Sequence, residues 1–119
     1  MIEQIPGLPP NILAFRASGR AERDDYRKVI TPAVEKAFAT GGKIRLLYEL
    51  GSYEGFDAGA MWTDLKIDGQ HLMRWERIAL VTDIDWIRQA IDTMGSMMPI
   101  EMRVFPLAEA AAAREWIAA

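Results

Sequence analysis

A nearly continuous apolar run, IRLLYEL, occupies residues 44–50. Such a run is typical of a strand whose sheet is covered on both faces, because both alternating sets of side chains are then buried. A second run of this kind, RIALVT, occupies residues 77–82. Parallel neighbours need a long crossover between them, and helices usually provide it. The two runs therefore predict an α/β fold built on a mostly parallel central sheet.

Three further strands are expected, for a sheet of about five strands. Residues 11–17 follow Pro9-Pro10 and place Ile12 and Ala14 on one side, with Leu13 and Phe15 on the other. Residues 101–105 alternate in the same manner. Residues 1–5 precede Pro6-Gly7 and read as a short edge strand. The short link between residues 1–5 and 11–17 favours an antiparallel N-terminal edge.

Apolar residues at three- and four-residue spacing predict about four helices flanking this sheet. The first covers Tyr26 to Phe38 and contains Pro32, which should kink it or start a second helix with Thr31 as N-cap. Gly41-Gly42 should end it. The other three are residues 56–75, a short helix capped by Asp83, and a final helix opened by Pro106. The expected order is β-β-α-β-α-β-α-β-α.

The bulk composition limits the class of protein. The 119 residues are enough for a single domain, 1–119, and contain no cysteine, which excludes disulfides, thiol nucleophiles and thiolate zinc sites. The net charge of −3 and the scattered basic residues argue against nucleic acid as a partner. There is no signal-peptide pattern and no apolar run that could form a transmembrane segment. A cytoplasmic location is expected, and peripheral membrane contact stays open.

Few residues suggest chemistry. Asp64, Asp68 and His71 would share one face of a continuous helix, as a weak metal site, an oriented general base or simply a polar outer face. Ser52 follows a strand but lacks the flanking glycines of a nucleophile elbow. Gly51, Gly55 and Gly59 match neither a dinucleotide fingerprint nor a P-loop. No catalytic residue, metal site or cofactor is therefore predicted.

The segment after the first buried strand is the best candidate for a working surface. Gly51, Gly55 and Gly59 could act as a hinge. The helix expected beyond them carries large apolar side chains that adapt to irregular ligands, namely Phe56, Met61, Trp62, Leu65, Met73 and Trp75. Lys66 and His71 could meet a polar head group. Two interpretations stay open: a mobile lid over an apolar pocket, or a stripe that packs permanently on the sheet.

Several local runs occur in an order that resembles a known family. These runs are DY at 25–26 with Pro32, GKIRLL at 42–47, WTDLK at 62–66, His71, RIALVTD at 77–83 with Trp86, EMRVF at 101–105, and EWI at 115–117. The chain resembles the SpoIIAA-like family, within the wider STAS and CRAL-TRIO (Sec14-like) fold group. The resemblance covers almost the whole chain and implies a regulatory or ligand-binding domain rather than an enzyme.

The resemblance also implies where this chain departs from its relatives. STAS domains of the anti-sigma-factor antagonist type are phosphorylated on a serine in an Asp-Ser-Ser-Gly-like motif at a helix start. The equivalent residues 49–55 read ELGSYEG, so Ser52 is not carried over as a phosphorylation site. The CRAL-TRIO side of the group is similar to lipid carriers that enclose an apolar ligand beneath a movable helix, in agreement with the glycine-flanked segment.

Three functions are therefore considered. The leading expectation is a non-enzymatic domain that binds a small apolar or amphipathic ligand between its sheet and the helix at residues 56–75. The second is an interaction module, in which the same helix docks a protein partner or a second copy in a homodimer. The third is an enzyme that uses Asp64 and His71.

Overall fold

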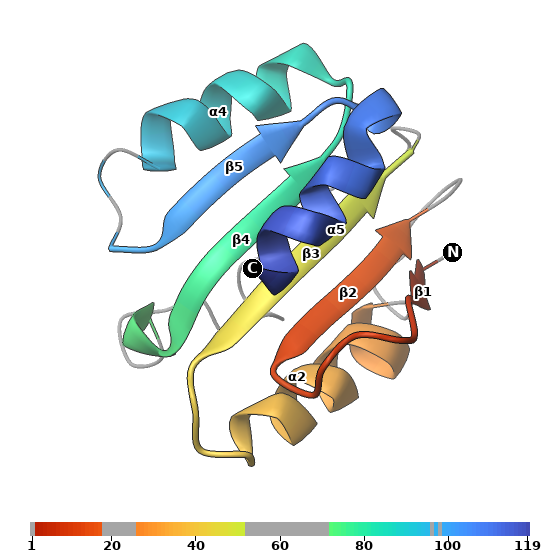
Figure 1. The fold of residues 1–119 in the computed structure, drawn as a ribbon, viewed down its shortest axis with the longest axis vertical. Helices are drawn as coiled ribbons and strands as arrows, with labels where there is room; N and C mark the ends of the chain where they lie inside the picture. The colour runs from red at the N-terminus through yellow and green to blue at the C-terminus, as the bar shows by residue number, and fades with distance from the viewer. Residues whose placement is uncertain (1, 18–25, 52–71, 96, 98) are drawn as a thin grey trace.

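A five-stranded mixed sheet forms the centre of the molecule (Figure 1). The structure, a computed structural model, describes residues 2–17, 26–51, 72–95, 97 and 99–119. The strands lie in chain order and are β1 (Ile2–Gln4), β2 (Ile12–Ala17), β3 (Ile44–Leu50), β4 (Trp75–Val81) and β5 (Glu101–Phe105). β1 pairs antiparallel with β2, and every other pair is parallel. The predicted α/β class and the antiparallel edge are confirmed.

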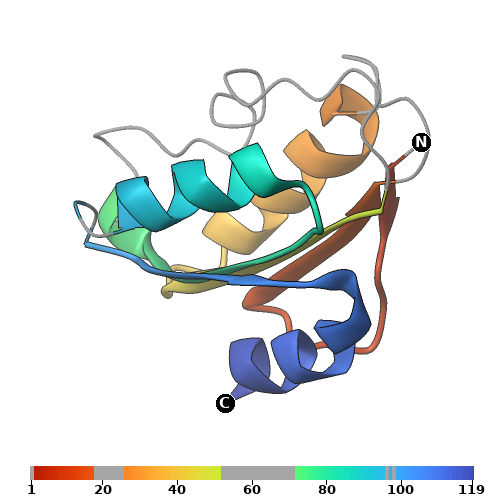
Figure 2. The same cartoon turned by 90° about the horizontal axis from the view of Figure 1, so that it is seen from above.

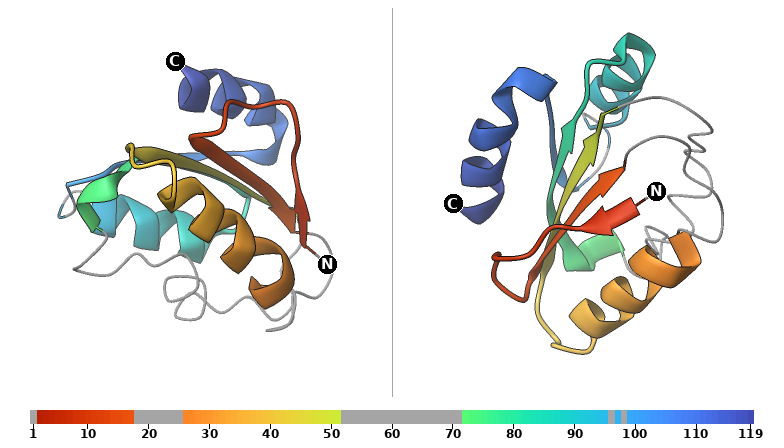
Figure 3. Two further views of the ribbon diagram at one scale, coloured as in Figure 1. Left: turned by 90° about the horizontal axis from the view of Figure 1, so that it is seen from below. Right: turned by 90° about the vertical axis from the view of Figure 1, so that its right-hand side faces the viewer.

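Helices cover both faces of the sheet, but unequally (Figures 2 and 3). The described helical elements are the π-helix η1 (Tyr26–Ile30), α2 (Thr31–Phe38), the 3-10 turn η2 (Leu72–Arg74), α4 (Asp85–Gly95), the 3-10 turn η3 (Leu107–Glu109) and α5 (Ala110–Ala118). Among the helices that the structure describes, α2 and α4 lie on one face and α5 lies on the other. Crossovers between parallel strands are right-handed, so strands added in one direction place their connecting helices on the same face. α5 follows the last strand and has no such constraint.

Pro32 divides the first helical segment in two. It has no N–H to donate to the carbonyl of Lys28, and the chain is a π-helix up to Ile30 and an α-helix from Thr31 onward. The expected break is therefore confirmed, whereas Thr31 as N-cap is wrong: Ile30 holds that position, without a side-chain cap, and Thr31 is the first helical residue. Gly41, with φ of +81°, turns the chain after α2 as predicted.

The larger core lies between the sheet and the face covered by η1, α2 and α4. Its fully or nearly fully buried members include Leu13, Phe15, Ile30, Val34, Ile44, Leu46, Tyr48, Trp75, Leu80 and Ile87. Successive side chains of a strand point to opposite faces, so alternate residues of β2, β3 and β4 enter this core. The helix stripe predicted from Tyr26 to Phe38 supplies its other side through Ile30, Val34 and Ala37.

α5 closes a smaller core on the opposite face. This core contains Ile12, Ala14, Leu47, Ala79, Val81, Phe105, Ala113 and Ile117. Arginines of the sheet hold the end of the helix: Arg45 Nη1 donates to the carbonyl of Ile117 at 2.8 Å, and Arg77 Nη1 donates to that of Trp116 at 3.0 Å. Such donors satisfy carbonyl groups that a helix leaves unpaired at its C-terminus.

Two predicted details are wrong. Trp75 is expected at the end of a helix, but the residues directly before it, Leu72–Arg74, form the 3-10 turn η2, and Trp75 is the first residue of β4. Asp83 was expected to cap the helix that follows β4. Its Oδ1 instead accepts a hydrogen bond from Leu107 N at 3.0 Å, at the start of η3, so the carboxylate joins two chain segments at the end of the sheet.

Candidate functional site

The carboxyl edge of the parallel strands is the usual place for a site in this kind of sheet. Described residues there mainly join neighbouring strands. Gly51 N donates to the carbonyl of Ala17 at 3.2 Å, and Thr82 N donates to that of Phe105 at 2.9 Å. Thr82 is fully buried, and its Oγ1 accepts from Ile84 N at 3.2 Å. These polar groups are satisfied within the protein, so this part of the edge is structural.

Most of the predicted site residues lie outside the described residues. These are Phe56, Met61, Trp62, Leu65, Lys66 and His71, together with Gly55, Gly59, Ser52, Asp64 and Asp68. Their roles stay predictions. Gly51 is described, is exposed and does not share the positive φ that only Gly7 and Gly41 show among the described glycines.

Two predicted ligand residues are described, and the structure separates them. Met73 lies in η2 with 66% of its surface exposed, whereas Trp75 is 2% exposed. The Trp75 ring packs edge-to-face on Phe38, with centroids 5.9 Å apart. Both residues lie at the amino end of β4, and Gly51 follows the carboxyl end of the neighbouring parallel strand. Gly51, the first glycine of the predicted hinge, and the predicted end of the helix are thus at opposite edges of the sheet.

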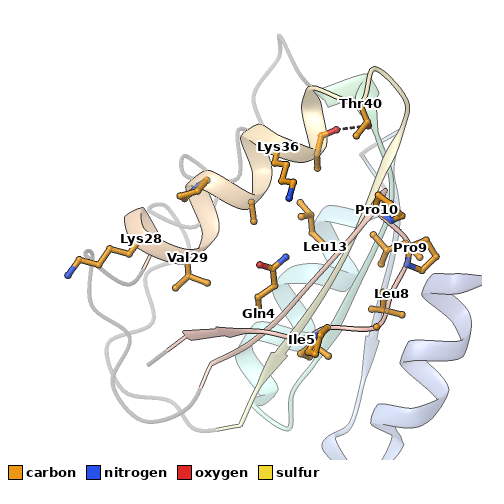
Figure 4. Close-up of a pocket in the computed structure, with 16 residues that line it drawn as sticks. Gln4, Ile5, Leu8, Pro9, Pro10, Leu13, Lys28, Val29, Lys36 and Thr40 are labelled. Atoms are coloured by element: carbon orange, nitrogen blue, oxygen red, sulfur yellow. Dashed lines mark hydrogen bonds between the residues drawn. The ribbon is translucent and has the colours of Figure 1, made fainter.

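A groove of about 650 Å³ lies elsewhere, between the β1–β2 connection and the helix formed by η1 and α2 (Figure 4). It is lined by residues 4–10, 12 and 13 on the sheet side and by Lys28, Val29, Pro32, Ala33, Lys36, Ala37 and Thr40 on the helix side. Ile5 N donates to the carbonyl of Ala14 at 2.8 Å and Ile12 N to that of Pro9 at 2.9 Å, which fixes the connection against β2.

The groove has an apolar interior and a few polar side chains. Leu13 and Ala37 are buried beneath it. The side chains of Lys36 and Gln4 extend from opposite walls into the space between helix and strand, whereas Lys28 points away from it (Figure 4). No Asp or Glu belongs to the described lining. The composition is that of a small-molecule site, in which a few polar groups orient an apolar ligand.

The connection that forms one wall of the groove contains Pro6-Gly7 and Pro9-Pro10. The edge strand β1 ends at Gln4, before these residues, as predicted. Gly7 has φ of +92°, so the connection also turns sharply there. The resulting loop stands opposite Val29 and Ala33 in the groove. That relation joins residues far apart in the chain and has no local sequence pattern.

A buried carboxylate lies on the α5 face. Glu49 is 6% exposed and accepts from Arg16 Nε at 2.9 Å and from Arg114 Nη2 at 3.0 Å. Both arginines are about half exposed, so they neutralise the carboxylate while reaching solvent. Glu49 joins β2, β3 and α5 through these bonds. No nucleophile or histidine accompanies it among the described residues, so its role is structural.

Two classes of feature are not found in the part of the chain that the structure describes. No three residues among its His, Asp and Glu side chains are placed to hold a metal ion. None of its helices is long and apolar enough to cross a membrane.

Comparison with known proteins agrees with this architecture. The chain is similar to one solved structure, the crystal structure of an uncharacterized protein of the DUF3478 family with a SpoIIAA-like fold, from Shewanella loihica PV-4. It is 26% identical, has a TM-score of 0.68, and the match covers 98% of this chain and 92% of that one. A search of curated proteins finds no match. The SpoIIAA-like family model matches residues 12–118, which span every described strand except β1. The chain therefore belongs to the SpoIIAA-like family.

Proposed function

We propose that this protein is a non-enzymatic domain that binds a small apolar or amphipathic molecule. The observation that supports the proposal is the groove between the β1–β2 connection and α2, with its volume of about 650 Å³. Ligand pockets in proteins commonly have volumes of roughly 300–1,000 Å³ and mostly apolar walls. Val29, Ala33 and Leu13 give the groove such walls.

The segment predicted from sequence stays a second location for the same ligand. Phe56, Met61, Trp62 and Leu65 would supply an apolar surface, with Lys66 or His71 at the head group. A cytoplasmic location and the absence of a nucleic-acid partner also stay predictions. The experiment must therefore separate the groove from residues 56–71.

Calorimetric titration of the full chain with decanol tests both the function and the location. We expect binding in the micromolar to millimolar range, and about tenfold weaker binding after Ala33→Phe, because the larger ring occupies the groove. Trp62→Ala serves as the comparison variant and should bind decanol as the unchanged protein does. Thermal unfolding of each variant checks that the fold persists.

Two results would contradict the proposed location or the proposed function. Loss of binding in Trp62→Ala alone would move the site to the predicted helix. No binding of decanol by the unchanged protein, and no apolar molecule retained in native mass spectra, would contradict the proposed function.

A specific observation also favours a second candidate, association with another copy of the chain. Met73 and Met97 are 66% and 77% exposed. They precede β4 and β5, which are neighbouring parallel strands, so both lie at the amino edge of the sheet. Exposed methionines are frequent at adaptable interfaces. This edge is therefore the candidate dimer surface.

Light scattering after size-exclusion chromatography tests the dimer. If the methionine edge forms it, Met97→Glu should convert the dimer to a monomer, because a carboxylate cannot be desolvated there without a partner. Trp86→Ala, at a residue that is 49% exposed on α4, is the matched control and should leave the dimer intact. A monomeric unchanged protein at high concentration would rule this candidate out.

A further inference from the structure

We propose that the groove beside β1 selects amphipathic molecules with an anionic head group, and that Lys36 binds the head. The inference rests on the proposed function and adds the charge of the ligand to it. It follows from the charges of the lining, the direction of three side chains and the apolar surface between them.

The charge of the described lining of the groove differs in sign from that of the whole chain. The whole chain carries a net charge of −3, yet the described lining of the groove has two lysines and no acidic residue. Glu3 and Glu35 are neighbours of lining residues in sequence but do not line the groove. The described lining of the groove therefore carries positive charge in an acidic protein. Such a site attracts anions and disfavours cations.

Neither lysine of the groove, Lys36 or Lys28, forms an ion pair within the part of the chain that the structure describes. The ammonium group of Lys36 therefore has donors available for a ligand, since each such group carries three. The polar side chain of Thr40 is engaged within the helix end, because its Oγ1 donates to the carbonyl of Ala37 at 2.7 Å.

The polar side chains of the groove point in different directions. Lys36 enters the groove from α2, and the Gln4 amide enters from β1 on the other wall (Figure 4). Lys28 points outward from the first part of the helix. A carboxylate or phosphate between the two walls could accept from Lys36 and from the Gln4 amide together, as charge-assisted bonds favour. Lys28 would contribute only through its longer-range field.

The groove also offers an apolar surface to the remainder of the ligand. Val29, Ala33 and Leu13 present apolar atoms next to the polar pair. A free inorganic anion would leave that surface in contact with water, whereas an alkyl chain would cover it. The chemistry that fits both parts is an alkyl chain with a single anionic group, either a carboxylate or a phosphate.

The test compares ligands that share one chain length, each kept below its critical micelle concentration. The full chain is titrated by calorimetry with decanoate, decyl phosphate, decanol and decyltrimethylammonium, and with butyrate and inorganic phosphate as short anions. We expect the two anionic amphiphiles to bind about tenfold more tightly than decanol, and the cation to bind more weakly than decanol. The advantage of the anions should fall as salt is added.

Three glutamine substitutions locate the head group. Lys36→Gln should weaken the binding of decanoate about tenfold, to the level of decanol, and should change the affinity for decanol much less. Lys28→Gln should reduce the preference by about threefold at most, because this side chain points to solvent. Lys43→Gln is the matched control, since Lys43 is exposed and does not line the groove, and it should have no effect.

Results that contradict the charge preference can be distinguished from results that contradict the proposed function. Equal binding of decanol and decanoate, or a preference that survives Lys36→Gln, would overturn this inference while the proposed function stands. Short anions that bind as tightly as decanoate would show an anion site without an alkyl subsite, which also overturns it. Failure of every ligand, decanol included, would contradict the proposed function itself.

Discussion

Replacing Trp75 by alanine is expected to destabilise the protein by about 3–5 kcal/mol, the range for truncating a large buried aromatic side chain. Trp75 is 2% exposed and packs against Phe38 in the larger core. Its removal leaves a cavity at the amino end of β4, where α2 meets the sheet. Urea denaturation followed by circular dichroism measures the change in the free energy of unfolding.

Trp86→Ala is the matched control for Trp75→Ala. Trp86 is 49% exposed on α4, and its truncation should change the unfolding free energy by about 0.5 kcal/mol or less. Comparable losses for the two tryptophans would contradict the placement of Trp75 in the core. If Trp75 lined a ligand pocket instead, as its sequence position suggested, Trp75→Ala would weaken decanol binding with little loss of stability.

Replacing Glu49 by alanine is expected to cost about 2–3 kcal/mol. Hydrogen bonds that involve charged groups typically contribute about 1.5–3 kcal/mol. Glu49 makes such bonds to two arginines, but those side chains are 50% and 41% exposed, so water recovers part of their loss. The carboxylate also joins β2 and β3 to α5. Its loss should therefore loosen the only helix on that face among the described elements.

A double-mutant cycle between Glu49→Ala and Arg114→Ala isolates the bond from the sheet to α5. The two changes should be less than additive, because each removes the same interaction. Glu101→Gln is the control: Glu101 pairs with Arg77 at 3.3 Å but its side chain is 67% exposed, and its change should cost about 1 kcal/mol or less. Additive effects at Glu49 and Arg114 would show that their pairing adds no stability.

The strands could be predicted because their side-chain patterns are local. The apolar runs that became β3 and β4, and the alternating residues that became β5, were assigned correctly to within two residues. The charged Arg45 and Glu49 do not interrupt this strand, because each forms hydrogen bonds or ion pairs on the α5 face. Parallel pairing followed from the order of elements alone.

The errors arise where the outcome depends on distant parts of the chain. Trp75 fitted both a helical stripe and the start of a strand, and periodicity cannot separate the two in a short apolar segment. The deciding factor was its packing on Phe38, far away in sequence. Asp83 has the chemistry of an N-cap, but its carboxylate accepts a hydrogen bond from Leu107 N, 24 residues away in the chain.

The candidate site was the least accessible to sequence reasoning. The sequence predicts a ligand site at Phe56, Met61 and Trp62 because large apolar side chains stand out in a sequence. The groove instead depends on how a proline-rich connection stands against Val29 and Ala33, and those small or medium side chains carry no distinctive pattern. Lys36 belongs to none of the motifs in the sequence. Its position opposite Gln4 emerges only in three dimensions.

The placement of α5 has a consequence for biosynthesis. All five strands precede this helix in the chain, and their face bearing Leu47, Ala79 and Val81 is buried against it. The strands are synthesised before α5, so this apolar face of the sheet is exposed until α5 has been made. Exposed apolar surface of this kind promotes aggregation with other chains. Arg45 of β3 and Arg77 of β4 flank this apolar surface, and their charges would oppose association with other chains. Once α5 has been synthesised, the two arginines bind the carbonyl groups at its C-terminus.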